Sequence, residues 1–233
     1  EATIRHIRER HHNPRYLSSA GFDVSLLSMS SNVKEVVNRS DVLVIAVPSA
    51  YAEESLAPLQ AGDWSAGNSS GKGKKVISAI KGLLPQKNIL LNEYLKQQFD
   101  VPLENYFAVL GPCHAEEVAA EKLSYLTFSG TDIRTASQIA SHFTTSYINT
   151  IVNHDIHGVQ FAAVMKNIYA LGAGMAHGLD YGDNFLSVYI ANAADEMAGF
   201  LKKFGVKHIT VGDHEGEDPF THRKTPNYAA SVY

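Results

Sequence analysis

The chain has 233 residues, of which 45% are hydrophobic and 19% are charged, and its formal net charge is −4. This balance is ordinary for a globular protein of one or two domains, and it excludes a nucleic acid or membrane partner held by bulk positive charge. The single cysteine, Cys113, excludes an internal disulfide framework and a zinc site built from several cysteines. No apolar run reaches bilayer-spanning length and no signal peptide opens the chain, so we expect a cytoplasmic protein without a membrane span.

The first part of the chain alternates between predicted helices and strands. After helices at residues 2–10 and 31–38, the apolar run at 41–48 is typical of a parallel strand buried on both faces. Ser49 is predicted to cap the next helix. Further strands are predicted at 75–80, 106–110, 123–129 and 147–152, and further helices at 89–99, 111–117 and 132–143. This alternation predicts an α/β fold, a doubly wound Rossmann-like parallel sheet with helices on both faces.

The pattern changes near His154, where the alternation stops. Two long helices are predicted at residues 156–177 and 184–204, and the second carries a helical stripe of apolar residues. We therefore expect a Rossmann-like domain over residues 1–153 and an all-helical domain over residues 154–233.

Smaller signals concern turns and helix ends. Asp183 and Gly205 are predicted as the N-terminal cap and the C-terminal stop of the last helix. Residues 67–73 resemble a phosphate-binding loop, but they are one residue short and precede a strand, so a turn is predicted instead. Residues 210–227 are polar and are predicted as an exposed loop.

Lys166 is an unexpected residue for its surroundings. It lies in residues 161–171, which are apolar nearly all round and are predicted to form a buried helix. A lysine there is costly unless it is paired, used in chemistry, or able to extend its ammonium group to water. The neighbouring Asn167 and the signals at the predicted strand ends favour a functional role.

Three predicted strands end in residues suited to binding. Pro48, Lys81 and Gly111 each follow a strand, and ligands bind at the carboxyl ends of parallel strands. The helix predicted after Gly111 would also offer free amides to an anion. With Lys166 facing them from the helical domain, these groups suit a small anionic carbonyl substrate.

Two further patterns give weaker hypotheses. Cys113 and His114 are neighbours at a predicted helix start, so a thiol–imidazole pair is not expected, although the helix end could lower the pKa of the thiol. His154 and His157 could share a helical face, but with Asp155 as the only nearby carboxylate no metal site is predicted.

Six segments, in order and spacing, resemble the NAD(P)-dependent glycerol-3-phosphate dehydrogenases of the bacterial type. They are residues 11–17, 46–49, 78–83, 111–119, 166–167 and 173–184. The resemblance implies that dihydroxyacetone phosphate is reduced to sn-glycerol 3-phosphate, for glycerophospholipid synthesis, with NADH or NADPH as the hydride donor. It is also compatible with a homodimer.

The resemblance assigns roles to individual residues. It makes Lys166 the general acid/base, which also binds substrate, and it implies no metal. The other substrate-binding residues that it implies are Lys81, Gly111, Cys113 and Asn167, and the cofactor-binding residues are Pro48, Lys81 and Ala115. Many members of the family carry Ser or Thr where Cys113 stands, which puts the substrate contact of this thiol in doubt.

Some family features are expected outside this sequence. They are the Gly-x-Gly-x-x-Gly turn that grips the pyrophosphate, a Gly-Asp pair, and an Arg-Asn pair that holds the substrate phosphate. We therefore expect the N-terminal part of the first domain and the C-terminal part of the second to be missing, and this chain alone to be unstable and inactive. The strand at 42–47 would then have an unpaired apolar edge.

Two alternatives remain for the function. One is a nucleotide-binding module that has lost the chemistry, which the presence of both Lys81 and Lys166 disfavours. The other is a related two-domain dehydrogenase for another small carbonyl substrate, which fits less well around Gly111 and around Asp183 and Asn184.

Overall fold

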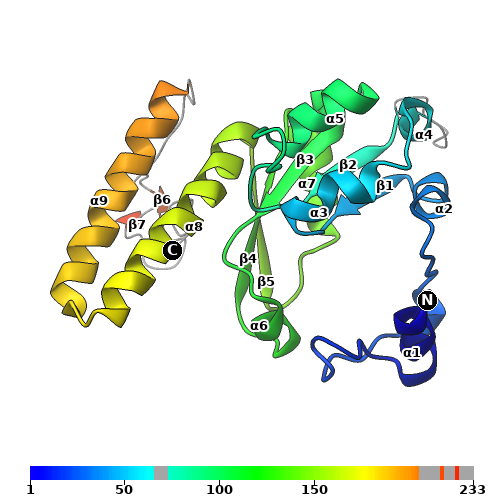
Figure 1. The fold of residues 1–233 in the computed structure, drawn as a ribbon, viewed down its shortest axis with the longest axis horizontal. Coiled ribbons are helices and arrows are strands. Elements are labelled where there is room, and N and C mark those ends of the chain that lie inside the picture. The colour runs from blue at the N-terminus through cyan, green and yellow to red at the C-terminus, as the bar shows by residue number, and fades with distance from the viewer. Residues whose placement is uncertain (66–72, 205–215, 218–223, 226–233) are drawn as a thin grey trace.

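The computed structural model describes residues 1–65, 73–204, 216–217 and 224–225 (Figure 1). The predicted alternation of helices and strands is confirmed, with ends that differ by a few residues. The helices are α1 (Ala2–Arg10), α2 (Val33–Asn38), α3 (Ser49–Leu56), α4 (Ala61–Ser65), α5 (Leu91–Phe99), α6 (Ala115–Ala119), α7 (Ile133–Ser141), α8 (Ile156–Gly178) and α9 (Gly182–Lys203), with 3-10 turns at Val24–Leu26 and Leu103–Asn105. The strands are β1 (Val42–Ile45), β2 (Lys75–Ser78), β3 (Tyr106–Leu110), β4 (Ser124–Ser129), β5 (Ile148–Asn153), β6 (Gly216–Glu217) and β7 (Lys224–Thr225).

Five strands form the central sheet in the order β1-β2-β3-β4-β5. The first three are parallel, as predicted, but β4 runs antiparallel to β3, with Leu110 opposite Thr127. β5 is parallel to β4. The prediction of a parallel sheet is therefore wrong at the β3–β4 pair. Because α6 has only five residues and spans about 7.5 Å, it does not return the chain along β3, and β4 starts at the edge where β3 ends.

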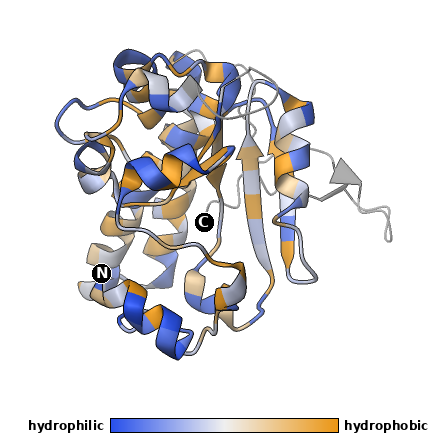
Figure 2. Ribbon diagram, turned by 90° about the vertical axis from the view of Figure 1, so that its right-hand side faces the viewer, coloured by the Kyte–Doolittle hydropathy of each residue, from blue (hydrophilic) through white to orange (hydrophobic). Residues whose placement is uncertain are grey.

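Helices cover both faces of the sheet, as the sequence predicts. Alternate strand residues point to opposite faces. On one face the strands pack against α3 and α5, through residues that include Val76, Ala108, Ala52 and Leu95. On the other face they pack against α7, through residues that include Ile77, Phe107, Phe128 and Ile139. Hydrophobic residues run through these strands at the centre of the molecule, whereas α1 is mainly hydrophilic (Figure 2).

β1 lies at one end of this sheet. Leu43 and Ile45 are buried, but Val42 and Val44 are 46% and 52% exposed. The prediction of a strand buried on both faces is therefore wrong, since within the described residues nothing covers the second face of β1. The predicted unpaired edge of this strand is confirmed for the described part of the chain.

α8 and α9 form a long helical pair joined by residues 179–181 (Figure 1). They pack through a small cluster of their own, in which Tyr169 meets Met197 and Leu201. The opposite side of α8 is open, and Ile168 and Leu171 are 63% and 68% exposed. The prediction that this helix is buried all round is therefore wrong, because the sheet and α9 cover only part of it in the described structure.

Several predicted helix ends differ from the structure. The N-cap of α3 is Pro48, and Ser49 instead lies against Gly82. The N-cap of α9 is Tyr181, and Asp183 stands in the first turn. Gly205 lies outside the described residues.

The remaining turn predictions fall mostly on undescribed positions. Of the predicted turn at 67–73, the structure describes only Gly73, which has a φ of +75°. Inside the predicted loop at 210–227, β6 and β7 form an antiparallel pair, so the loop prediction is wrong at those four residues. Among the helices of the described ranges, none combines the length and apolarity that crossing a bilayer requires.

Candidate active site

The loops after β1 and β2 meet at the carboxyl edge of the sheet. Because these strands are parallel, Pro48 and Lys81 leave the sheet at the same edge. Gly82 has a φ of +152°, and a Cβ atom built on it would lie 3.1 Å from the Ser49 Oγ atom. The two loops therefore touch, which places two of the predicted binding segments side by side.

The loop after β3 is pressed against the start of β4. Gly111 has a φ of +144°, and a Cβ atom there would lie only 2.5 Å from the backbone oxygen of Tyr125. The Tyr125 backbone amide in turn donates to the Pro112 oxygen at 3.3 Å. Only glycine fits this turn, and Cys113 and His114 follow it in the loop between β3 and α6.

Lys81 lies close enough to two other predicted site residues to affect their ionisation. Burial lowers the pKa of the Lys166 ammonium below its usual range, and the positive charge of Lys81 lowers it further. Burial raises the pKa of the Cys113 thiol, and the charge of Lys81 opposes that rise. The tertiary structure thus brings together residues from the loops after β2 and β3 and from α8.

Cys113 does not have the ionisation that a helix start could have given it. The expected lowering of its thiol pKa is wrong, since burial outweighs the neighbouring charge and raises the pKa. α6 is a single short helix capped by the backbone of His114. Cys113 is therefore a half-buried thiol whose raised pKa disfavours the reactive thiolate.

α8 carries Lys166 toward this edge. Its N-terminus is held by Asp155, whose carboxylate accepts from the Gly158 amide at 2.8 Å, and by Ile156, which is buried in the core. From Ile156 the helix rises about 15 Å to Lys166. Lys166 is half-buried there, while its neighbour Asn167 is exposed.

One long-range contact at the site was not predicted. The Tyr16 hydroxyl donates to the Glu116 carboxylate at 2.5 Å, which joins the segment after α1 to α6, next to Ala115. Local sequence patterns cannot find such a pair, because the two residues are 100 positions apart. In the sequence, Tyr16 belongs to the segment 11–17, which carries part of the family resemblance.

The predicted absence of a metal site concerns the two histidines near the start of α8. His157 interacts with a protein group: its Nε2 atom lies 3.4 Å from the Asn92 Nδ2 atom. In the described part of the chain, no group of three or more His, Cys, Asp or Glu side chains is arranged to hold a metal ion.

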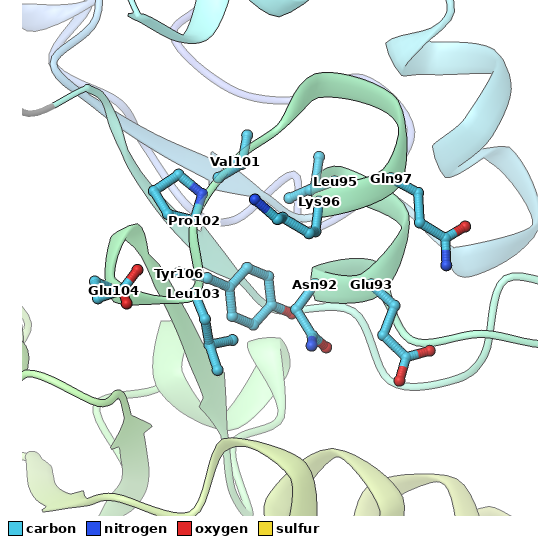
Figure 3. Close-up of a pocket in the computed structure, with 10 residues that line it drawn as sticks. All are labelled: Asn92, Glu93, Leu95, Lys96, Gln97, Val101, Pro102, Leu103, Glu104 and Tyr106. Atoms are coloured by element: carbon cyan, nitrogen blue, oxygen red, sulfur yellow. The ribbon is translucent and has the colours of Figure 1, made fainter.

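A pocket of about 450 Å³ lies elsewhere, between α5 and the segment that leads into β3 (Figure 3). None of its lining residues belongs to the predicted site. They are Asn92, Glu93, Leu95, Lys96, Gln97, Val101, Pro102, Leu103, Glu104 and Tyr106. We place the candidate site at Lys81 and Lys166 instead, because parallel strand ends and a lysine of lowered pKa meet there.

The fold and the sequence both match known oxidoreductases. The sheet and the helical pair are similar to a glycerol-3-phosphate dehydrogenase structure from Coxiella burnetii, with a TM-score of 0.76, 22% identity, and coverage of 88% of this chain and 59% of that one. A glycerol-3-phosphate dehydrogenase structure from Plasmodium falciparum has a TM-score of 0.74 and 28% identity, and it covers 89% of this chain and 56% of that one. The fold class is therefore that of a Rossmann-like oxidoreductase with a helical C-terminal region.

Two family models give the particular family. Residues 1–136 match the N-terminal part of NAD-dependent glycerol-3-phosphate dehydrogenase, and residues 155–216 match its C-terminal part. A Latilactobacillus sakei protein named glycerol-3-phosphate dehydrogenase [NAD(P)+] is 30% identical over 213 residues, which cover 89% of this chain. This chain belongs to the NAD-dependent glycerol-3-phosphate dehydrogenase family. It spans 60% of the length of that relative.

Proposed function

We propose that this chain carries the catalytic lysine and part of the substrate and cofactor sites of a glycerol-3-phosphate dehydrogenase. The reaction is the reduction of dihydroxyacetone phosphate to sn-glycerol 3-phosphate with NADH or NADPH, and its product supplies glycerophospholipid synthesis. The observation that carries the proposal is the lowered pKa of the Lys166 ammonium on α8, caused by burial and by the charge of Lys81 at the carboxyl edge of the sheet, in a chain of this family.

Lys166 is proposed as the general acid. Its ammonium group donates a proton to the carbonyl oxygen of the substrate as that oxygen gains negative charge, and it recovers the proton in the reverse direction. Burial and the charge of Lys81 lower its pKa, which weakens its hold on the proton and favours transfer nearer to neutral pH. Lys81 contacts the substrate and adds a second positive charge beside a phosphorylated anion.

The remaining contacts complete one side of the site. Gly111 and Cys113 line the substrate, and Asn167 offers an amide to a substrate hydroxyl. Gly111 matters through its backbone, since a side chain there would collide with β4. The Cys113 thiol stays protonated at neutral pH, because burial raises its pKa, and it acts as a small, weakly polar wall.

The residues present fit the nicotinamide end of a dinucleotide. Pro48, Lys81 and Ala115 follow the three parallel strands whose ends share one edge, and Gly82 lets the first two loops approach closely. When bound, the nicotinamide supplies the hydride. The sequence contains no Gly-x-Gly-x-x-Gly turn for the pyrophosphate, so these residues hold one part of the cofactor only.

Three further expectations belong to the proposal. Residues 1–153 act as the NAD(P)-binding domain and residues 154–233 as the helical substrate domain. The proposed location is the cytoplasm, and the single cysteine is in keeping with that reducing compartment. A homodimer is the proposed assembly, and light scattering of the purified protein measures it.

The test is the oxidation of NADH and NADPH in the presence of dihydroxyacetone phosphate, measured on the complete protein and on its Lys166→Ala variant, since this chain alone is expected to be inactive. We expect turnover to be lost in Lys166→Ala while cofactor binding persists. Lys202→Ala, which removes an exposed lysine at the end of α9, is the matched control and should keep parental turnover. Turnover near the parental value in Lys166→Ala, or cofactor binding by the parent without reduction of any ketone phosphate, would contradict the proposal.

A further inference from the structure

A buried polar cluster joins the start of α8 to the sheet and to α5. The Gln160 Oε1 atom accepts a hydrogen bond from the Tyr106 hydroxyl at 2.7 Å. Its Nε2 atom donates to Asn92 Oδ1 at 3.1 Å and to the backbone oxygen of Ile156 at 3.0 Å. Gln160, Tyr106 and Asn92 are 5%, 1% and 8% exposed, so the cluster is nearly closed to water. Figure 3 shows Asn92 and Tyr106 beside each other at the base of the pocket.

The amide of Gln160 is fully used, because both N–H groups and the oxygen have partners. Burial raises the pKa of the Tyr106 hydroxyl, which keeps it protonated as the donor. Apolar side chains at this contact would tolerate some rotation of α8, whereas directional hydrogen bonds to two other elements do not. The cluster therefore sets the rotation of α8 about its axis and its height along β3.

Lys166 is six residues further along the same helix, about 9 Å from Gln160. A side-chain tip lies about 5–6 Å from a helix axis, so a rotation of about 20° moves it by about 2 Å. Displacements of about 1 Å can reduce turnover about 100-fold. The rotation set at Gln160 therefore decides whether the Lys166 ammonium meets the substrate at the loop that carries Lys81.

We propose that Gln160 is a positioning residue for Lys166, acting through the rigid helix α8 and with Tyr106 and Asn92 as its anchors. The inference rests on the proposed function, in which Lys166 is the general acid, but it concerns a residue that touches neither substrate nor cofactor. In the sequence, Gln160 is a single polar residue just before the apolar segment 161–171, and its spacing alone does not show its partners.

The test replaces Gln160 by methionine in the complete protein, which keeps the length of the side chain and removes all three hydrogen bonds. We expect kcat to fall at least about 10-fold, with the KM for NADH or NADPH within about twofold of the parent. Rates are normalised to the amount of bound cofactor, so that a smaller folded fraction does not imitate the effect. Gln98→Met, the same change at an exposed position of α5, is the control and should leave kcat unchanged. A normalised kcat within about twofold of the parent would overturn the proposal.

Two further measurements apply if the variant does not fold or if the parent is inactive. If Gln160→Met does not fold, Tyr106→Phe removes the 2.7 Å bond to Gln160 together with the hydrogen bond between Tyr106 and Ser78. A kcat equal to that of the parent would then count against the proposal. If the parent does not reduce dihydroxyacetone phosphate, the proposed function fails, and crystal structures of the parent and of Gln160→Met decide the positioning role by themselves. A rotated or shifted α8 supports that role, and an unmoved α8 excludes it.

Discussion

Gly111→Ala tests the turn that carries the loop after β3. Its φ of +144° is costly for a residue with a side chain, by about 1–3 kcal/mol. The added Cβ would also lie 2.5 Å from the Tyr125 oxygen, a backbone atom of β4 that cannot turn aside. Relief of such overpacking costs about 1–3 kcal/mol more, so we expect the free energy of unfolding to fall by about 2–6 kcal/mol.

The assay is urea and thermal unfolding of the parent and of the variant. For a protein of this size the expected loss corresponds to a fall in Tm of about 4–24 °C. Gly174→Ala is the control, because it adds the same methyl group at an exposed position of α8 where nothing lies within 4 Å. It should stabilise the protein by about 0.5–1 kcal/mol, through helix propensity. A free energy of unfolding for Gly111→Ala within about 0.5 kcal/mol of the parent would refute the reasoning.

Three further outcomes are expected. Because the pKa of Lys166 is lower in the folded than in the unfolded protein, the unfolded state binds more protons between the folded pKa and about 10.5. Stability should therefore rise with pH through that window, and chemical denaturation of Lys166→Met should show a flatter rise; an identical slope would argue against the burial of this ammonium. Lys81→Met should raise the Lys166 pKa, seen as an alkaline shift in an NMR titration, and no shift would show that the two charges do not interact. Asp155→Ala removes the side-chain cap of α8 and should cost about 1 kcal/mol of unfolding free energy, whereas an unchanged Tm would mean that the cap contributes nothing.

Much of the fold could be predicted from local patterns. The residues of β3 are apolar or aromatic at every position and are buried on both faces. This continuous run was enough to predict the strand and its length. The antiparallel direction of β4 could not be predicted from local patterns. It depends on the length of α6, which is too short to return the chain along β3. The same limit applies to β1 and α8, whose apolar residues predicted burial, whereas exposure depends on which elements lie against them.

For the candidate site, too, some features were predicted from the sequence and others were decided only by the tertiary structure. By itself, the sequence determined which residue types follow each parallel strand, that Lys166 stands in an apolar helix, and which family the chain resembles. Only the tertiary structure decided that burial raises the pKa of the Cys113 thiol, and that the charge of Lys81 influences the pKa values of both Lys166 and Cys113. It also decided that Gln160 is tied to Tyr106, 54 residues away. The physical reason is that periodicity is a property of neighbouring residues, whereas desolvation, charge interactions and hydrogen-bond partners are set by segments that meet only on folding.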